Sequence, residues 1–154
     1  MTVAYRLCRS RYPPTSGKGA ALHGGTWNPK GKRAVYASES RALAALEVLV
    51  HFGVLPKNYT VTEIRIPDSV KIIRVEVFWL GAWSPTEDWI AQSRGEEWFQ
   101  NRDSAVLSVP SKIIPEERNY VLNVEHPHFR RIEFLPSKPF ILDPRLKPIP
   151  RERR

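Results

Sequence analysis

A single carboxylate interrupts an apolar segment of the chain and is the first residue whose type and setting could do chemistry. Glu47 is the only polar residue between positions 42 and 50, and the composition of residues 41–52 predicts a buried helix. An ionised carboxylate is costly to bury alone, so Glu47 must be paired, protonated or directed into a cavity. His51 follows four residues later on the same helix face and is the obvious neighbour.

Two interpretations of Glu47 are open at this point. In the functional one, the carboxylate lies at the floor of a pocket, where it acts as a base or holds a substrate hydroxyl. In the structural one, Glu47 and His51 form a narrow polar stripe through which the helix meets solvent. Residue types and spacing do not choose between the two.

A glycine-rich loop, HGGTWNPKG at residues 23–31, is the second candidate feature. Its paired glycines would let backbone N–H groups approach a phosphate, with Lys30 and Lys32 close by. The P-loop and dinucleotide-binding patterns are both missing from it, so a plain turn is the alternative. Trp27 within the loop could stack on a planar ligand or pack in the core.

The elements that must position these residues are many short strands and few helices. We expect Ser38 or Ser40 to begin the helix over residues 41–52 and Gly53 to end it. Residues 84–101, which open with Ser84, predict one or two short helices broken near Gly95. Strands are predicted at residues 3–7, 34–37, 59–66, 71–77, 105–109, 119–122, 131–135 and 139–142. The sum is a mixed α+β fold with one buried helix that carries Glu47.

Length and composition set outer limits on this fold. The chain has 154 residues, of which 42% are hydrophobic, enough for one domain with its own core. The single cysteine, Cys8, excludes a disulfide framework and a multi-cysteine zinc site. No apolar run approaches the roughly 20 residues that a bilayer span needs, and no secretory signal is visible. We therefore expect a cytoplasmic protein.

The net charge of +8 is concentrated at the two ends of the chain. Residues 1–38 contain seven Lys and Arg and no acid, and residues 144–154 contain five bases and one acid. Such an imbalance favours an anionic partner, which could be nucleic acid, a phosphorylated ligand or an acidic protein. The basic tail has no interleaved aromatics and no recognised nucleic-acid motif accompanies it, so direct nucleic-acid binding is not expected.

Several segments, taken together and in order, resemble one family, the RES-domain toxins of bacterial RES-Xre type II toxin-antitoxin systems. The matching segments are Tyr5-Arg6, GGTWNPKG (24–31), AVYASES (34–40), LAALEVLVH (43–51), VPSKIIPEERNYVLNVEHPHF (109–129) and FILDPRL (140–146). The resemblance implies an ADP-ribosyltransferase-like RES domain over residues 1–146. Residues 147–154 would then form a basic, flexible tail.

The resemblance also implies NAD as a substrate, consumed by hydrolysis or phosphorolysis of the nicotinamide-ribose bond, or used for ADP-ribose transfer to a protein. It implies catalytic roles for Glu47, Tyr36 and Ser111: charge stabilisation, stacking on nicotinamide and a hydrogen bond to the substrate. The implied binding residues are Arg6, Gly24, Gly25, Thr26, Trp27 and Asn28. No metal is expected. The implied partner is an Xre-family antitoxin that would mediate any DNA contact, with a homodimer within the complex.

Position 26 departs from the family pattern. The family loop is usually G-G-R-W-N, whereas Thr26 stands here where the family has Arg. A threonine cannot supply the forked cation that an arginine offers to a pyrophosphate. Either Arg6, Lys30, Lys32 or Arg33 substitutes for it, or the chain is an attenuated or non-catalytic variant that acts as a binding module.

Overall fold

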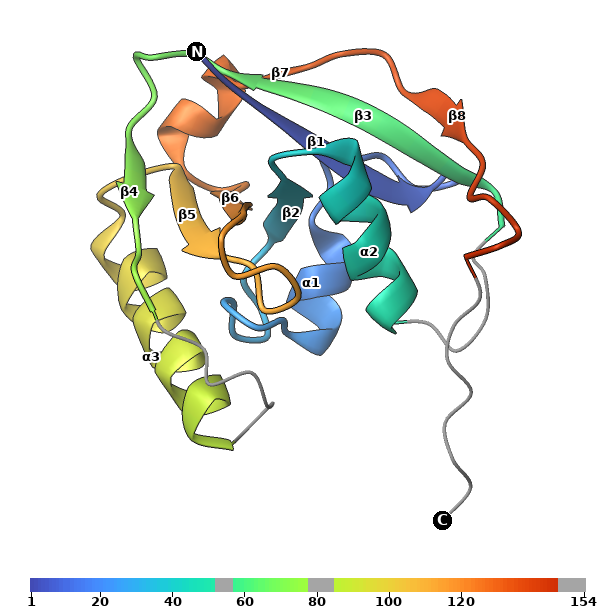
Figure 1. Cartoon of the computed structure of the whole chain (residues 1–154). Helices are drawn as coiled ribbons and strands as arrows, with labels where there is room; N and C mark the ends of the chain where they lie inside the picture. The colour runs from blue at the N-terminus through green and yellow to red at the C-terminus, as the bar shows by residue number, and fades with distance from the viewer. Residues whose placement is uncertain (52–56, 78–84, 147–154) are drawn as a thin grey trace.

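One eight-stranded sheet organises the computed structural model, which describes residues 1–51, 57–77 and 85–146 (Figure 1). The strands are β1 (Thr2–Arg9), β2 (Ala34–Ser38), β3 (Tyr59–Ile66), β4 (Ile72–Arg74), β5 (Val106–Pro110), β6 (Arg118–Asn123), β7 (Glu133–Phe134) and β8 (Lys138–Phe140). Their order is β4-β5-β6-β2-β1-β3-β7, and β8 also pairs with β3. All pairs are antiparallel except β4 with β5. The predicted α+β class is confirmed.

In the described part of the chain, three α-helices and one 3-10 helix accompany the sheet: α1 (Lys18–His23), α2 (Arg41–His51), α3 (Pro85–Asn101) and η1 (Pro127–Arg131). Figure 1 shows α2 lying across β1 and β2, whereas α3 lies below β4 and β5 in this view. None of the helices in the described residues is long and apolar enough to span a bilayer.

The two faces of the sheet follow from the period-two alternation of its strands. On β2, Val35 and Ala37 join a core with Ile64 and Leu122 on one face. Ala34 and Tyr36 point to the other face, where a second core contains residues of the glycine-rich loop, α3, β5 and β6: Trp27, Ala91, Trp98, Phe99, Leu107, Val109 and Val121. Tyr36, Ser38 and Asn119 therefore share one face of the sheet.

The helix predicted over residues 41–52 is confirmed as α2 (Arg41–His51), but it is buried on one face only, and Val50 is exposed. Ser40 is its N-cap, because Ser40 Oγ accepts the N–H of Leu43 at 3.0 Å. The apolar face buries Leu43, Ala44 and Ala45, which anchors the helix on the sheet and leaves Glu47 half-buried. Gly53, the predicted stop, lies outside the described residues.

The prediction that residues 84–101 break near Gly95 is wrong, because α3 runs unbroken through that glycine. A Cβ built at Gly95 would overlap the backbone carbonyl of Trp27. The glycine therefore allows the helix backbone to approach the glycine-rich loop closely, a tertiary reason that outweighs its low helix propensity. Ser84 lies outside the described residues.

The predicted strands are confirmed, the one over residues 59–66 with the same ends and the other seven with shifted ends. The short helices α1 and η1 were not predicted. Gly17 at the start of α1 and Gly24 at its end both have positive φ, and these glycines favoured a loop prediction. The 3-10 helix η1 begins where His126 Nδ1 accepts the N–H of His128 at 3.0 Å. Its single turn has too little periodicity to show in the sequence.

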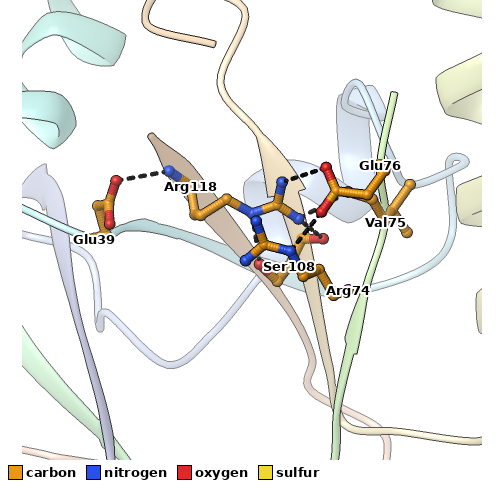
Figure 2. Close-up of polar contacts among 6 residues, drawn as sticks. All are labelled: Glu39, Arg74, Val75, Glu76, Ser108 and Arg118. Carbon is orange, nitrogen blue, oxygen red and sulfur yellow. Dashed lines mark hydrogen bonds and ion pairs between the residues drawn. The ribbon is translucent and has the colours of Figure 1, made fainter. Parts of the chain in front are cut away.

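A buried arginine ties β4, β5 and β6 together at one end of the sheet (Figure 2). Arg118 donates from Nε to Ser108 Oγ at 3.0 Å, and from Nη2 to the carbonyls of Ser108 and Val75, both at 2.8 Å. Its Nη1 lies 3.5 Å from the carboxylate of Glu76, and its backbone N–H donates to Glu39 Oε1 at 2.9 Å. Burial is the main cause that lowers the pKa of Arg118, with the nearby Arg74 charge next. These contacts fix the strand ends beside the candidate site.

Candidate active site

A cavity of about 700 Å³ opens on the face of the sheet that carries Tyr36 and Asn119. Its walls come from β1, α1, the glycine-rich loop, β2, α2 and the segment after β5. Several residues singled out from the sequence line it: Arg6, Gly24, Gly25, Thr26, Trp27, Tyr36 and Glu47. Its volume lies within the range typical of small-molecule and cofactor sites.

Glu47 is held at the cavity by two donors from the sheet. Glu47 Oε1 accepts a hydrogen bond from Ser111 Oγ at 2.9 Å and another from Asn119 Nδ2 at 2.7 Å. The second oxygen, Oε2, receives no hydrogen bond from the residues that the structure describes. The side chain is thus a carboxylate with one fixed oxygen and one available oxygen, on the wall of a cavity.

Ser111 lies behind this carboxylate, not at the cavity surface. It is fully buried, and its hydroxyl oxygen accepts the N–H groups of Ile113 and Ile114 at 3.0 and 3.2 Å. With both lone pairs occupied, its one proton is directed to Glu47. The buried Ser111 hydroxyl therefore forms its hydrogen bonds with Glu47 and with the turn that follows β5.

Asn119 and Ser38 complete the site and were missed as functional residues in the sequence. Ser38 Oγ donates to Asn119 Oδ1 at 2.7 Å, and the two residues are directly opposite each other on β2 and β6. Asn119 lies within the 109–129 segment that resembles the RES family, which was its only signal. The pairing of residues 81 positions apart needs the register of β2 and β6 to be known.

His51 does not supply the partner that helix spacing suggested for Glu47. It is exposed at the end of α2 and lines the same cavity. Within the described part of the chain, neither a hydrogen bond nor an ion pair joins it to Glu47. Ser111 and Asn119 contact the Glu47 carboxylate from the sheet, whereas His51 on the same helix does not.

Tyr36 anchors the glycine-rich loop through its hydroxyl. The hydroxyl donates to Asn28 Oδ1 at 2.6 Å and accepts the N–H of Trp27 at 3.1 Å. Burial raises the pKa of Tyr36 well above its usual range, so the phenol stays protonated and keeps donating to Asn28. Since Tyr36 also lines the cavity, its ring is the part that can meet a ligand.

Many backbone groups of the glycine-rich loop form hydrogen bonds within the protein. The N–H of Gly24 donates to the Ala20 carbonyl at 2.8 Å, and that of Gly25 to the Asn28 carbonyl at 3.0 Å. The buried Asn28 donates to the Ala20 and Lys32 carbonyls at 2.8 and 3.1 Å. A Cβ at Gly25 would overlap the Asn28 and Tyr36 side chains. The loop is therefore a rigid wall, and any phosphate contact falls mainly to side chains that line the cavity.

Cationic side chains that could meet such a phosphate are present. Arg6 donates from Nη1 to the Tyr36 carbonyl at 2.9 Å, while its buried Nε has no hydrogen-bond partner among the described residues. Burial is the main cause that lowers the pKa of Arg6, although its guanidinium stays charged at neutral pH. Arg9 and Lys112 line the same cavity, and Lys112 also lies 3.4 Å from Asp88 of α3. Thr26 adds no charge.

Comparisons with known proteins identify the family of the chain. The "Prs ADP-ribosylating toxin" of Sphingobium sp. (strain YBL2) is 40% identical over 138 residues, 85% of each chain. A "Toxin Res" from Photorhabdus laumondii is 39% identical, covering 79% of this chain and 81% of that protein. The toxin-antitoxin complex MbcT-MbcA of M. tuberculosis contains a chain with the same fold, at a TM-score of 0.68 and 16% identity over 89% of this chain and 82% of that one. The RES domain model matches residues 3–143, and the chain belongs to the RES domain family.

Proposed function

We propose that this chain is a toxin that consumes NAD by cleaving the bond between nicotinamide and ribose. One observation carries the proposal: Glu47 is fixed through one oxygen at a cavity of about 700 Å³ that the cationic Arg6 also lines. Two similar proteins are named as toxins, one of them as an ADP-ribosylating toxin. That name presupposes chemistry at the same bond of NAD.

The chemistry needs a group that stabilises positive charge. When the bond breaks, its electron pair leaves with nicotinamide and the ribose C1 becomes oxocarbenium-like. Oε2 of Glu47 would face that charge or hold the adjacent ribose hydroxyl, and a carboxylate aimed at developing charge in a water-poor pocket is among the strongest catalytic devices. The oxygen of water or of inorganic phosphate then bonds to C1 and a proton is released. The products are nicotinamide and either ADP-ribose or its 1-phosphate.

The remaining lining residues supply binding. Arg6, Arg9 and Lys112 offer cations for the pyrophosphate, and the Tyr36 ring offers a surface on which nicotinamide can stack. The glycine-rich loop is anchored by Asn28 and Tyr36, and its residues Thr26 and Trp27 line the cavity. Because the Gly24 and Gly25 N–H groups already donate to carbonyls of the protein, side chains bind the phosphates in this proposal.

A second candidate is ADP-ribose transfer to a protein side chain. The name of the Sphingobium relative favours it, and the bond cleaved in NAD is the same. We further propose that an Xre-family antitoxin covers the cavity, supplies any DNA contact and holds a toxin homodimer in the complex. The structural neighbour from M. tuberculosis was solved as a toxin-antitoxin complex, which supports a partner of this kind.

Product analysis tests the proposal and separates its branches. The purified chain is incubated with NAD in phosphate-free buffer, in phosphate buffer and with a cell lysate, and nicotinamide, ADP-ribose, ADP-ribose 1-phosphate and labelled protein are quantified. ADP-ribose in both buffers indicates hydrolysis, the 1-phosphate indicates phosphorolysis, and labelled protein indicates transfer. The absence of nicotinamide release in all three incubations would contradict the proposal.

A further inference from the structure

We propose that Asn119, oriented by Ser38, is a positioning residue that fixes the reactive carboxylate of Glu47. The inference rests on the proposed function, since it assigns how that carboxylate is aimed. Ser38 is buried on β2 and Asn119 is its direct cross-strand neighbour on β6. Side chains paired in this way stand on the same face of a sheet at close range, which here is the face with the cavity.

The direction of every hydrogen bond in this group is fixed by chemistry. A carboxylate only accepts, so Asn119 must turn its Nδ2 toward Glu47 and its Oδ1 toward Ser38. Ser38 must then donate, as the 2.7 Å contact from its Oγ to Asn119 Oδ1 shows. If Ser38 is removed, Asn119 Oδ1 loses its donor, and the amide loses one of the two contacts that fix its position against the carboxylate.

Two separate segments thus grip the same carboxylate oxygen. Ser111 reaches Glu47 Oε1 from the end of β5 at 2.9 Å, and Asn119 reaches it from β6 at 2.7 Å. Hydrogen bonds to a charged acceptor are about twice as strong as neutral ones. Because both donors act on Oε1, the rotation of the carboxyl group is restricted and Oε2 stays available at the cavity. The neutral amide achieves this without cancelling the negative charge that the reaction needs.

Substitution of Asn119 tests the inference with a readout that a purely structural role would not move. In Asn119→Ala, kcat for nicotinamide release should fall about tenfold or more while KM for NAD changes little. In Asn119→Asp, two carboxylates would face each other and must share a proton. The acid limb of the pH-rate profile should therefore move to higher pH. His51, Arg6 and Lys112 line the same cavity and are unchanged in both variants, so they do not cause the difference.

Ser38 provides the second test. Ser38→Ala alone should lower kcat about fivefold, the size of one lost hydrogen bond, but should have no further effect in an Asn119→Ala background. Asn123→Ala is the matched control, because Asn123 is a buried asparagine on the same strand whose Oδ1 accepts the N–H of Glu125. It should lower the melting temperature and leave turnover per folded molecule unchanged.

The outcomes separate this inference from the proposed function. If Glu47→Gln abolishes turnover but Asn119→Ala and Ser38→Ala match the wild type, the positioning role is overturned and the proposed function stands. If the Ser38 and Asn119 effects multiply independently, or if Asn119→Asp leaves the pH profile in place, the relay through Asn119 is overturned. If Glu47→Gln keeps full turnover, the proposed function itself fails.

Discussion

Arg118 and Asn119 are sequence neighbours on β6, yet they serve opposite faces of the sheet and opposite purposes. Arg118 directs its guanidinium donors to Ser108, Val75 and Glu76, so its charge is used within the protein (Figure 2). Asn119 joins a group in which Glu47 keeps one oxygen available at a cavity. A buried polar group such as Arg118, whose hydrogen bonds are all made within the protein, stabilises the fold. A group such as Glu47, which has only one oxygen bonded by the residues that the structure describes, can act on a ligand with the other.

The largest stability effect is expected at the Arg118 cluster. Arg118→Met should lower the free energy of unfolding by about 3 kcal/mol, because the Ser108 hydroxyl and the Val75 and Ser108 carbonyls lose a charged donor. Denaturant unfolding measures this change. Arg145→Met is the matched control, since the exposed pair of Arg145 with Asp143 should contribute less than about 1 kcal/mol. Equal losses in the two variants would show that the buried contacts of Arg118 stabilise the fold no more than an exposed ion pair does.

The contact between α3 and the glycine-rich loop should give the next largest effect. Gly95→Ala would place a methyl group against the Trp27 carbonyl and should lower the free energy of unfolding by about 2 kcal/mol. Gly19→Ala is the control, because an added Cβ there meets no atom within 4 Å and alanine favours the α1 helix. Thermal unfolding of both variants measures the difference. A stable Gly95→Ala protein would show that the loop is not held by α3.

Ser111 should couple stability to turnover. Ser111→Ala removes the donor to Glu47 and the acceptor for two backbone amides, so nicotinamide release should fall about tenfold and stability by about 1 kcal/mol. Ser104→Ala is matched in burial and in hydrogen bonding to Trp98 and Val106. It should lower stability alone. Turnover that drops equally in both variants would assign Ser111 a purely structural role.

Thr26 should give the smallest effect. Thr26→Arg adds a cation at the cavity wall and should raise the rate of NAD consumption about threefold, the size of one partly exposed charge contact. Thr26→Met matches much of the added bulk without the charge and should produce no gain. If the rate in Thr26→Arg does not rise, the hypothesis of an attenuated variant is contradicted and Arg6, Arg9 or Lys112 carries the role.

The sequence was informative where local physics decides the outcome. The apolar run around Glu47 predicted α2, and alternation predicted most strands, because burial and periodicity are local signals. The same local rules narrowed the helix N-cap to Ser38 or Ser40, and the structure identifies Ser40. The conspicuous position of Glu47 could be seen without any knowledge of its neighbours.

The sequence was uninformative where tertiary contacts decide. Gly95 lies inside a helix and lets Trp27 of a distant loop approach the helix backbone, and no local rule contains that contact. Helix spacing suggested His51 as the partner of Glu47, whereas the actual donors are separated from Glu47 by 64 and 72 positions. Asn119 and Ser38 become neighbours only through the register of β2 and β6. Residues that hold a reactive group are therefore harder to predict than the group itself.

In the proposed function the Glu47 carboxylate performs the chemistry of the cavity, and the decisive experiment measures nicotinamide release by Glu47→Gln. The variant keeps the size of the side chain, and we expect a loss of at least about 100-fold in the rate of nicotinamide release with a melting temperature close to that of the wild type. The comparison is made at equal concentrations of folded protein. A Glu47→Gln protein that releases nicotinamide at the wild-type rate would show that the Glu47 carboxylate is not required for the reaction.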